Sequence, residues 1–168
     1  MNIVAIILVI CSSVGLAFFF IRKEIRHCAV LAEAINIVEY ISGRAEFFKE
    51  PLSDIMKTDV AQNKNSFVKL CVCFGEELKN GITVPDAWLN TVRKTFDGIM
   101  EDYEQDILID FGQNLCRCSS FEIGNLKAKT VSDLNDLRKT AIENKNTKTK
   151  SMAAVTVSAG VIIVLMFA

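Results

Sequence analysis

The sequence predicts an all-α protein in which two transmembrane helices flank a cytoplasmic antiparallel helical bundle. Residues 3–21 and residues 152–168 form two uncharged, predominantly apolar runs, and every Asp, Glu, Lys and Arg lies between them. The intervening chain has only two prolines, and none of its segments alternates apolar and polar residues as a half-buried strand does. These observations favour helices throughout.

The lengths of the two apolar runs fit a bilayer. At ~1.5 Å of rise per residue they span roughly 28 and 26 Å, close to the ~30 Å hydrocarbon core. We therefore expect a transmembrane helix in residues 1–21, a helical bundle in residues 22–150 and a second transmembrane helix in residues 151–168. The alternatives are a signal peptide for the first run and a buried core helix for the second. The bulky sequence Phe18-Phe19-Phe20 and the basic residues that follow it disfavour a cleaved signal.

Basic side chains flank both runs on their inner sides. They are Arg22, Lys23 and Arg26 after the first run, and Lys145, Lys148 and Lys150 before the second. Lys and Arg next to a membrane span stay cytoplasmic, and anionic lipids favour them by ~1 kcal/mol each. The sequence therefore predicts a cytoplasmic bundle with both termini outside.

The first soluble helix carries apolar positions at three- and four-residue steps: Ile25, Cys28, Leu31, Ile35, Val38 and Ser42. Nothing interrupts the chain before Gly43, so this helix is expected to continue from the first span and to stop at that glycine. Pro51 then suits the start of a short helix, where its missing N–H does no harm.

The middle of the chain predicts two amphipathic helices. Ser66 is the expected N-cap of the first, and Gly81 its C-cap. Its apolar face is Phe67, Leu70, Cys71, Phe74 and Leu78. The second opens at Pro85, and its buried face is predicted to be Trp88, Leu89, Val92 and Phe96. Asp97-Gly98 is interpreted as a pause in that helix.

Two further helices complete the predicted bundle, separated by a turn at residues 116–120. The first carries Ile107, Leu108, Phe111 and Leu115, and the second carries Ile123, Leu126, Thr130, Leu134, Leu137 and Ala141. The first and last soluble helices both meet the membrane, so they must run antiparallel. Their apolar residues form long, narrow stripes, as in a coiled-coil hairpin. The shorter helices are expected to cap the membrane-distal end.

A charge cluster is the strongest candidate for a binding site. The segment from Asp97 to Asp110 contains six acidic residues and no basic one. We expect it at the far end of the bundle, away from lipid, either as a solvated helix face or as a docking surface for a basic partner. The candidate partner-binding residues are Glu77, Glu101, Asp102, Glu104 and Asp106, chosen because they lack a local counter-charge in the sequence.

Catalytic, metal and nucleic-acid functions have little support in the sequence. The pairs Cys71/Cys73 and Cys116/Cys118 have one intervening residue, whereas structural zinc sites use two or more. His27 is the only histidine, no Gly-rich phosphate loop occurs, and the net charge is −1. We therefore expect no enzyme activity, no cofactor, no metal and no nucleic-acid partner. A redox or metal enzyme that uses the cysteines is kept as an alternative hypothesis.

The order of motifs along the whole chain resembles the stage III sporulation protein AB family of endospore-forming Firmicutes. The resemblance rests on Glu50-Pro51-Leu52, on residues 74–81 (FGEELKNG), on Ala87-Trp88 and on residues 108–115 (LIDFGQNL), between the two terminal spans. The lone tryptophan and the Phe-Gly-x-x-Leu motif are its most specific parts. The chain departs from the family pattern at Cys116, Ser119 and Gly124.

The resemblance implies a fold similar to the cytoplasmic domains of the inner-membrane platform protein of type II secretion and type IV pilus machines. It implies a non-enzymatic component of the sporulation channel, placed in the mother-cell membrane. The implied partners are the stage III sporulation protein AA-type ATPase and sibling membrane proteins of the channel, beside membrane lipids; a homo-oligomer stays open. The alternative function is a two-span membrane signalling or regulatory adaptor without catalytic activity.

Overall fold

The computed structural model describes residues 3–57, 66–119 and 121–167, and it describes side-chain burial mainly between residues 18 and 147. These ranges contain six helices and no strand, so the all-α fold class is confirmed. The helices are α1 (Ile3–Phe48), α2 (Leu52–Ile55), α3 (Ser66–Lys79), α4 (Val84–Phe96), α5 (Asp102–Leu115) and α6 (Ile123–Phe167).

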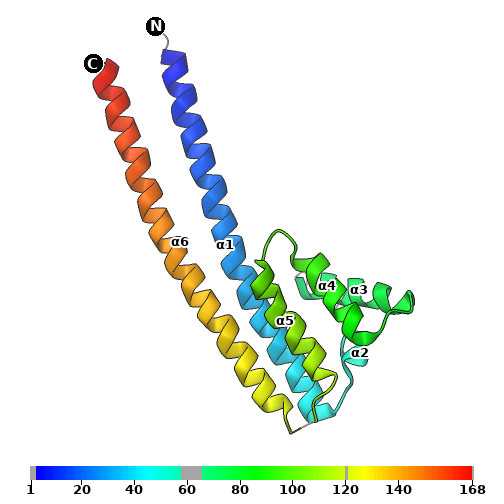
Figure 1. The fold of residues 1–168 in the computed structure, drawn as a ribbon. Coiled ribbons are helices and arrows are strands. Elements are labelled where there is room, and N and C mark those ends of the chain that lie inside the picture. Colours follow the sequence, from blue (N-terminus) through cyan, green and yellow to red (C-terminus); the bar gives the residue numbers. More distant parts are fainter. Residues whose placement is uncertain (1–2, 58–65, 120, 168) are drawn as a thin grey trace. The chain divides into compact units, whose positions relative to one another are not determined.

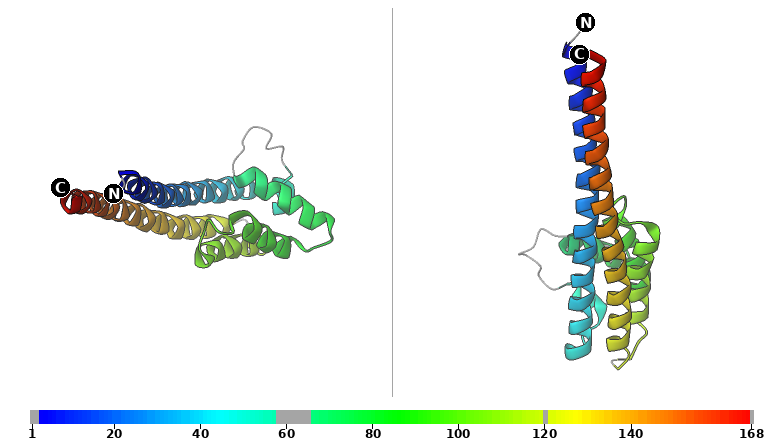
Figure 2. Two further views of the ribbon diagram at one scale, coloured as in Figure 1. Left: turned by 90° about the horizontal axis from the view of Figure 1, so that it is seen from above. Right: turned by 90° about the vertical axis from the view of Figure 1, so that its left-hand side faces the viewer.

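The chain forms two compact units (Figure 1). The first unit consists of residues 1–28 and 139–168, and its described parts are the outer ends of α1 and α6. The second unit, residues 29–138, holds α2 to α5 together with the inner parts of α1 and α6. Within the second unit the two long helices lie side by side and run antiparallel, as predicted (Figure 2).

No helical segment among the described residues combines the length and the apolar character needed to cross a bilayer. Most side chains of the two predicted spans lie outside the described set.

The first helix does not stop at Gly43, contrary to the prediction. It continues to Phe48 because the extra turn buries Ala45, and one glycine costs a helix only ~1 kcal/mol. The helix ends where Lys49 takes a left-handed conformation with φ 55°, followed by Glu50, whose helical conformation is disfavoured by Pro51. The predicted continuity of this helix with the N-terminal apolar run is confirmed.

Two other predicted helix boundaries need correction. Asp97-Gly98 ends α4 completely, because Asp97 is extended and Gly98 has φ 66°. Ser66 is the first helical residue of α3 in the described range, and its backbone N–H donates to the Glu33 carboxylate on α1 (3.3 Å). The predicted left-handed Gly81 after α3 is confirmed, with φ 79°.

The core of the second unit is built around α4, which packs against α3 on one side and α5 on the other. Trp88, Val92 and Phe96 of the predicted face are fully buried, while Leu89 is only half-buried. On α1, the predicted stripe is buried from Leu31 onward, whereas Ile25 is exposed. The smaller helices therefore share one apolar core.

The smaller helices do not cap the far end of the bundle as predicted. Instead α5 lies alongside α1 and runs in the same direction (Figures 1 and 2). Its C-terminal residue Leu115 reaches the same groove as Ala45 near the end of α1 and Ile123 at the start of α6. The end of the unit is therefore formed by α1, α5 and α6 themselves.

The Trp88 side chain packs closely against the backbone of α5. The Trp88 indole Nε1–H donates to the Leu108 carbonyl (2.7 Å), and the indole is fully buried. A Cβ at Gly112, one turn after Leu108, would overlap Nε1 and Cδ1 of this ring. The indole is thus accommodated because residue 112 has no side chain, and its edge contact with Phe74 (ring centroids 6.4 Å apart) links α3 to the same cluster.

Gly112→Ala should lower the free energy of unfolding by roughly 1–3 kcal/mol, because the methyl group forces the indole off its position. Thermal unfolding of the full-length protein, followed by circular dichroism and Trp88 fluorescence, measures the effect. Gly75→Ala is the matched control: it is also within a helix, a Cβ there meets nothing within 4 Å, and the change should raise stability by up to about 1 kcal/mol. Equal stability of wild-type protein and Gly112→Ala would contradict the proposed packing.

Candidate functional site

The predicted acidic residues of α5 lie against α4, which supplies the basic partner that the local sequence lacks. Arg93 on α4 contacts Asp106 (2.6 Å) and Asp102 (3.4 Å) through its guanidinium. The same group lies 3.4 Å from the Gln105 side-chain oxygen. Both aspartates stay exposed, so these ion pairs are screened and individually contribute ~1 kcal/mol or less.

Two of the candidate acids form the N-terminus of α5. Glu101 is the N-cap, and together with Glu104 it makes a capping box in which each side chain accepts from the other residue's backbone N–H. The Glu101 N–H donates to Glu104 Oε2 over 2.9 Å. Glu104 is only 1% exposed and serves the helix end, whereas Glu101 is exposed and remains accessible to a partner.

Glu77 is also buried, on α3 against α4. Its carboxylate accepts from Asn90 Nδ2 (3.0 Å) and forms an ion pair with the Lys94 ammonium, which is itself largely exposed. The hydrogen bond from Lys94 is the main cause that lowers the pKa of Glu77; Asn90 adds to it and burial opposes it. The pKa of Lys94 is raised, chiefly by the same hydrogen bond. Glu77 therefore joins α3 to α4 and presents no free carboxylate.

The premise that these acids lack counter-charges does not hold for three of them. Lys94 neutralises Glu77, and Arg93 contacts both Asp102 and Asp106. Sequence reasoning missed both basic residues because they belong to a different helix from the acids; Arg93 and Lys94 are adjacent on α4, but they reach different neighbouring helices. The five candidates do not form one surface: Glu101, Asp102 and Asp106 are exposed together on α5, whereas Glu77 and Glu104 are structural.

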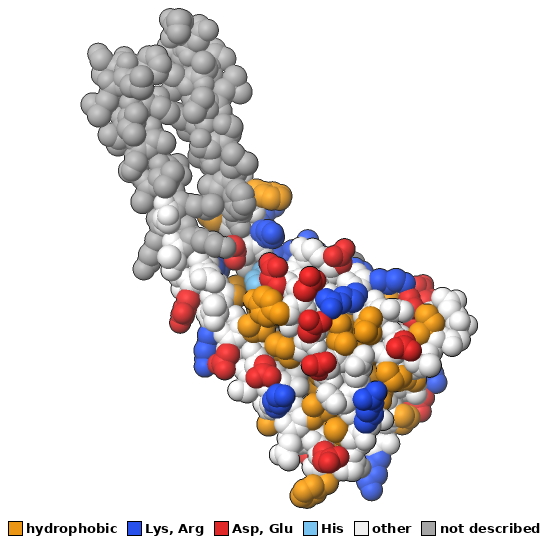
Figure 3. Space-filling model, viewed as in Figure 1, with side chains coloured by type: hydrophobic (Ala, Val, Ile, Leu, Met, Phe, Trp, Pro, Cys, Tyr) orange, Lys and Arg blue, Asp and Glu red, His pale blue; other side chains and the backbone are white. Residues whose placement is uncertain are grey.

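The position of the acidic surface also differs from the prediction. We define this surface as the exposed residues Glu101, Asp102 and Asp106, and Figure 3 shows acidic side chains, with basic ones among them, on the face that carries α5. Because α5 runs in the direction of α1, its first turn lies at the end of the unit where α1 enters, at Ala29. The opposite end, where α1 stops and α6 begins, has a different chemistry.

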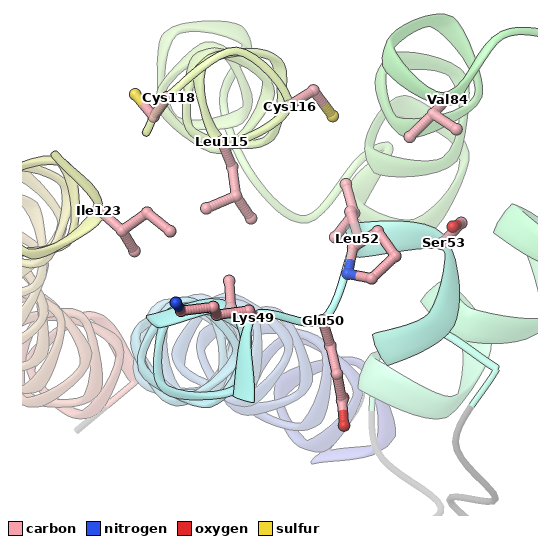
Figure 4. Close-up of a pocket in the computed structure, with 11 residues that line it drawn as sticks. Lys49, Glu50, Leu52, Ser53, Val84, Leu115, Cys116, Cys118 and Ile123 are labelled. Atoms are coloured by element: carbon pink, nitrogen blue, oxygen red, sulfur yellow. The ribbon is translucent and has the colours of Figure 1, made fainter. Parts of the chain in front are cut away.

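That opposite end contains a groove of about 380 Å³. Its lining comes from the end of α1, from α2, from the first residue of α4, from the end of α5 and from the start of α6 (Figure 4). The apolar lining residues are Ala45, Pro51, Leu52, Val84, Leu115 and Ile123. The remaining lining residues are Lys49, Glu50, Ser53, Cys116 and Cys118. No sequence pattern indicated this groove, because it joins residues from four separate segments.

The five cysteines whose side chains the structure describes are free thiols. Cys116 and Cys118 both line the groove, but their sulfur atoms point in different directions (Figure 4). Cys71 lies half-buried on α3, and burial raises the pKa of its thiol to about 11. Among the residues described, no three His, Cys, Asp or Glu side chains gather in a way that would hold a metal ion.

The model of one protein family, described as stage III sporulation protein AB, matches residues 2–168 of the chain. The chain belongs to the stage III sporulation protein AB family. The match covers the two terminal helices as well as the bundle, so the predicted resemblance is confirmed. No curated protein and no solved structure matches the chain significantly.

The motifs that indicated this family converge in the core of this member. Trp88 and residues 108–115 form the indole–backbone contact, and Glu77 from residues 74–81 is the carboxylate paired with Lys94. Glu50-Pro51-Leu52 ends α1, opens α2 and lines the groove. These motifs therefore describe how the helices are joined.

The Glu77–Lys94 pair predicts an acid-sensitive stability. Because the pKa of Glu77 is lower in the folded protein than its ordinary 4.5, the pair stabilises the fold above about pH 4.5, and this contribution is lost as the pH falls through the lower folded value. Glu77→Gln should be less stable than wild type at pH 7, and the difference should shrink below pH 4.5. Urea unfolding between pH 3 and pH 7 measures this. Lys94→Met should likewise reduce the loss of stability that accompanies the fall in pH below 4.5, because the lysine that lowers the pKa of Glu77 is removed. Parallel profiles of stability against pH for all three proteins would contradict the assignment.

Proposed function

We propose that the protein is a non-enzymatic membrane component of the sporulation channel between mother cell and forespore, and that it docks a cytoplasmic secretion-type ATPase of the stage III sporulation protein AA type. Membership of a sporulation family along the whole chain is the observation that carries this proposal. The terminal apolar runs and the basic residues on their inner sides favour two anchors with the bundle in the cytoplasm.

The arrangement of the second unit supports a binding role rather than catalysis. In the groove, the carboxylate of Glu50 is held by Arg44 in a two-point contact (2.8 and 2.9 Å), and the other polar lining residues are Lys49, Ser53, Cys116 and Cys118. The buried acids Glu77 and Glu104 are used to join or cap helices. What remains on the outside is an acidic surface suited to a basic partner, where charge complementarity sets the orientation and rate of docking.

The acidic surface can be tested by charge reversal at Asp102 and Asp106, which are exposed and outside the capping box. Asp102→Lys/Asp106→Lys should abolish co-purification of the ATPase with the full-length protein in detergent, while helicity by circular dichroism is unchanged. Glu39→Lys/Glu76→Lys is the matched control, because it reverses two exposed acids on α1 and α3. Undiminished binding by the α5 variant would remove the acidic surface from the proposal.

The proposed topology can be tested by thiol labelling in intact cells. A membrane-impermeant maleimide should label Asn2→Cys from outside and should leave the exposed native Cys116 unlabelled until the membrane is permeabilised. Cys71 is a poorer reporter because its raised pKa of about 11 keeps the thiol protonated. Labelling of Cys116 in sealed cells would contradict a cytoplasmic bundle.

A further inference from the structure

Three exposed phenylalanines lie close in the chain to Lys49 and Ile123, which line the groove at the end of the second unit. Phe47 and Phe48 end α1 and are 77% and 67% exposed, and Phe121 precedes α6 and is 93% exposed. We call these three residues the aromatic end. At roughly 200 Å² for each ring, the three side chains together leave on the order of 500 Å² of aromatic surface in water.

Two acidic side chains near the groove accept hydrogen bonds, whereas two basic side chains there form no ion pair with any described residue. Glu50 is held by Arg44, and Glu122 accepts from the backbone N–H and the hydroxyl of Ser119 (3.0 and 2.9 Å). The ammonium of Lys49 and the guanidinium of Arg117 are both exposed, and no described side chain forms an ion pair with either. Lys49 in the groove lining, and Arg117 between the lining residues Cys116 and Cys118, therefore place positive charge beside apolar surface.

A partly apolar groove, with exposed phenylalanines and two basic residues in or next to its lining segments, fits an amphipathic helix. In that mode of recognition, apolar side chains at helical spacing enter the groove and charged residues beside them meet the rim. The cavity of about 380 Å³ has room for one or two large side chains, and Lys49 and Arg117 select carboxylates on the flanks.

We propose that the groove and the aromatic end bind a helix of the ATPase that carries aliphatic or aromatic anchors flanked by Asp or Glu. This inference rests on the proposed function and adds a second contact to the acidic surface. The two contacts have opposite charge and lie at opposite ends of α5, so together they admit the partner in one orientation only. A second copy held in the same membrane would present its groove in the same direction, which makes the two grooves poor partners for each other.

The experiment measures the affinity of the purified ATPase for the full-length protein in detergent. Phe121→Asp and Arg117→Glu should each weaken binding at least tenfold, and the loss for Arg117→Glu should shrink at high salt. Val72→Asp and Lys79→Glu are the controls: they also replace an apolar residue by Asp and a basic residue by Glu, at exposed sites on α3, and should bind as wild type does. All of these side chains are exposed, and circular dichroism checks that each variant folds.

The outcomes separate this inference from the proposed function. If the wild-type protein does not bind the ATPase, the proposed function fails and the groove loses its occupant. If the wild type binds and both Phe121→Asp and Arg117→Glu bind equally well, only the groove assignment is overturned. It is overturned as well if Phe121→Asp leaves ATPase affinity unchanged but dissociates a dimer seen by light scattering, or weakens binding to phosphatidylglycerol vesicles.

Discussion

The fold of the second unit depends on one contact, between the buried Trp88 indole and the backbone of α5. An indole N–H buried without an acceptor costs free energy, so the donor must reach a carbonyl, and here it reaches that of Leu108. The ring approaches this closely only because Gly112 presents no side chain. One large side chain, one carbonyl and one glycine thus fix the separation and rotation of α4 against α5.

Electrostatic contacts reinforce the same helix pairs. Arg93 reaches Asp102 and Asp106 across the α4–α5 contact, and Lys94 reaches Glu77 across the α4–α3 contact. Neighbouring basic residues on α4 therefore join it to both of its neighbours, because successive positions on a helix point about 100° apart. Lys94 neutralises Glu77 on α3, and Arg93 offsets part of the charge of Asp102 and Asp106, so a smaller acidic surface remains on α5 than the sequence indicates.

Sequence reasoning predicted the helices well because apolar periodicity and turn residues are local signals. It placed Trp88, Phe96 and Phe111 in the core, and it identified the short helix after Pro51. It was wrong at Gly43, since a glycine ends a helix only where the backbone turns left-handed, and here that residue is Lys49. It was also wrong to place α5 in a cap at the far end of the bundle, because the position of a helix beside α1 depends on long-range packing. Burial of Glu77 and Glu104 could not be read from the sequence, because their partners lie on other elements or in the backbone.

The distribution of exposed groups shows what the fold leaves for binding. Phe47, Phe48 and Phe121 are exposed, although burying each ring would stabilise the fold by roughly 1.5–3 kcal/mol. Lys49 has φ 55°, a conformation that glycine adopts with less strain. The turn after α1 places this lysine in the groove lining and directs the chain to Pro51 and Leu52 in the groove wall. Two of the phenylalanines and Lys49 are consecutive at the end of α1, and this concentration of unfavourable features agrees with the proposed binding of a partner at the groove.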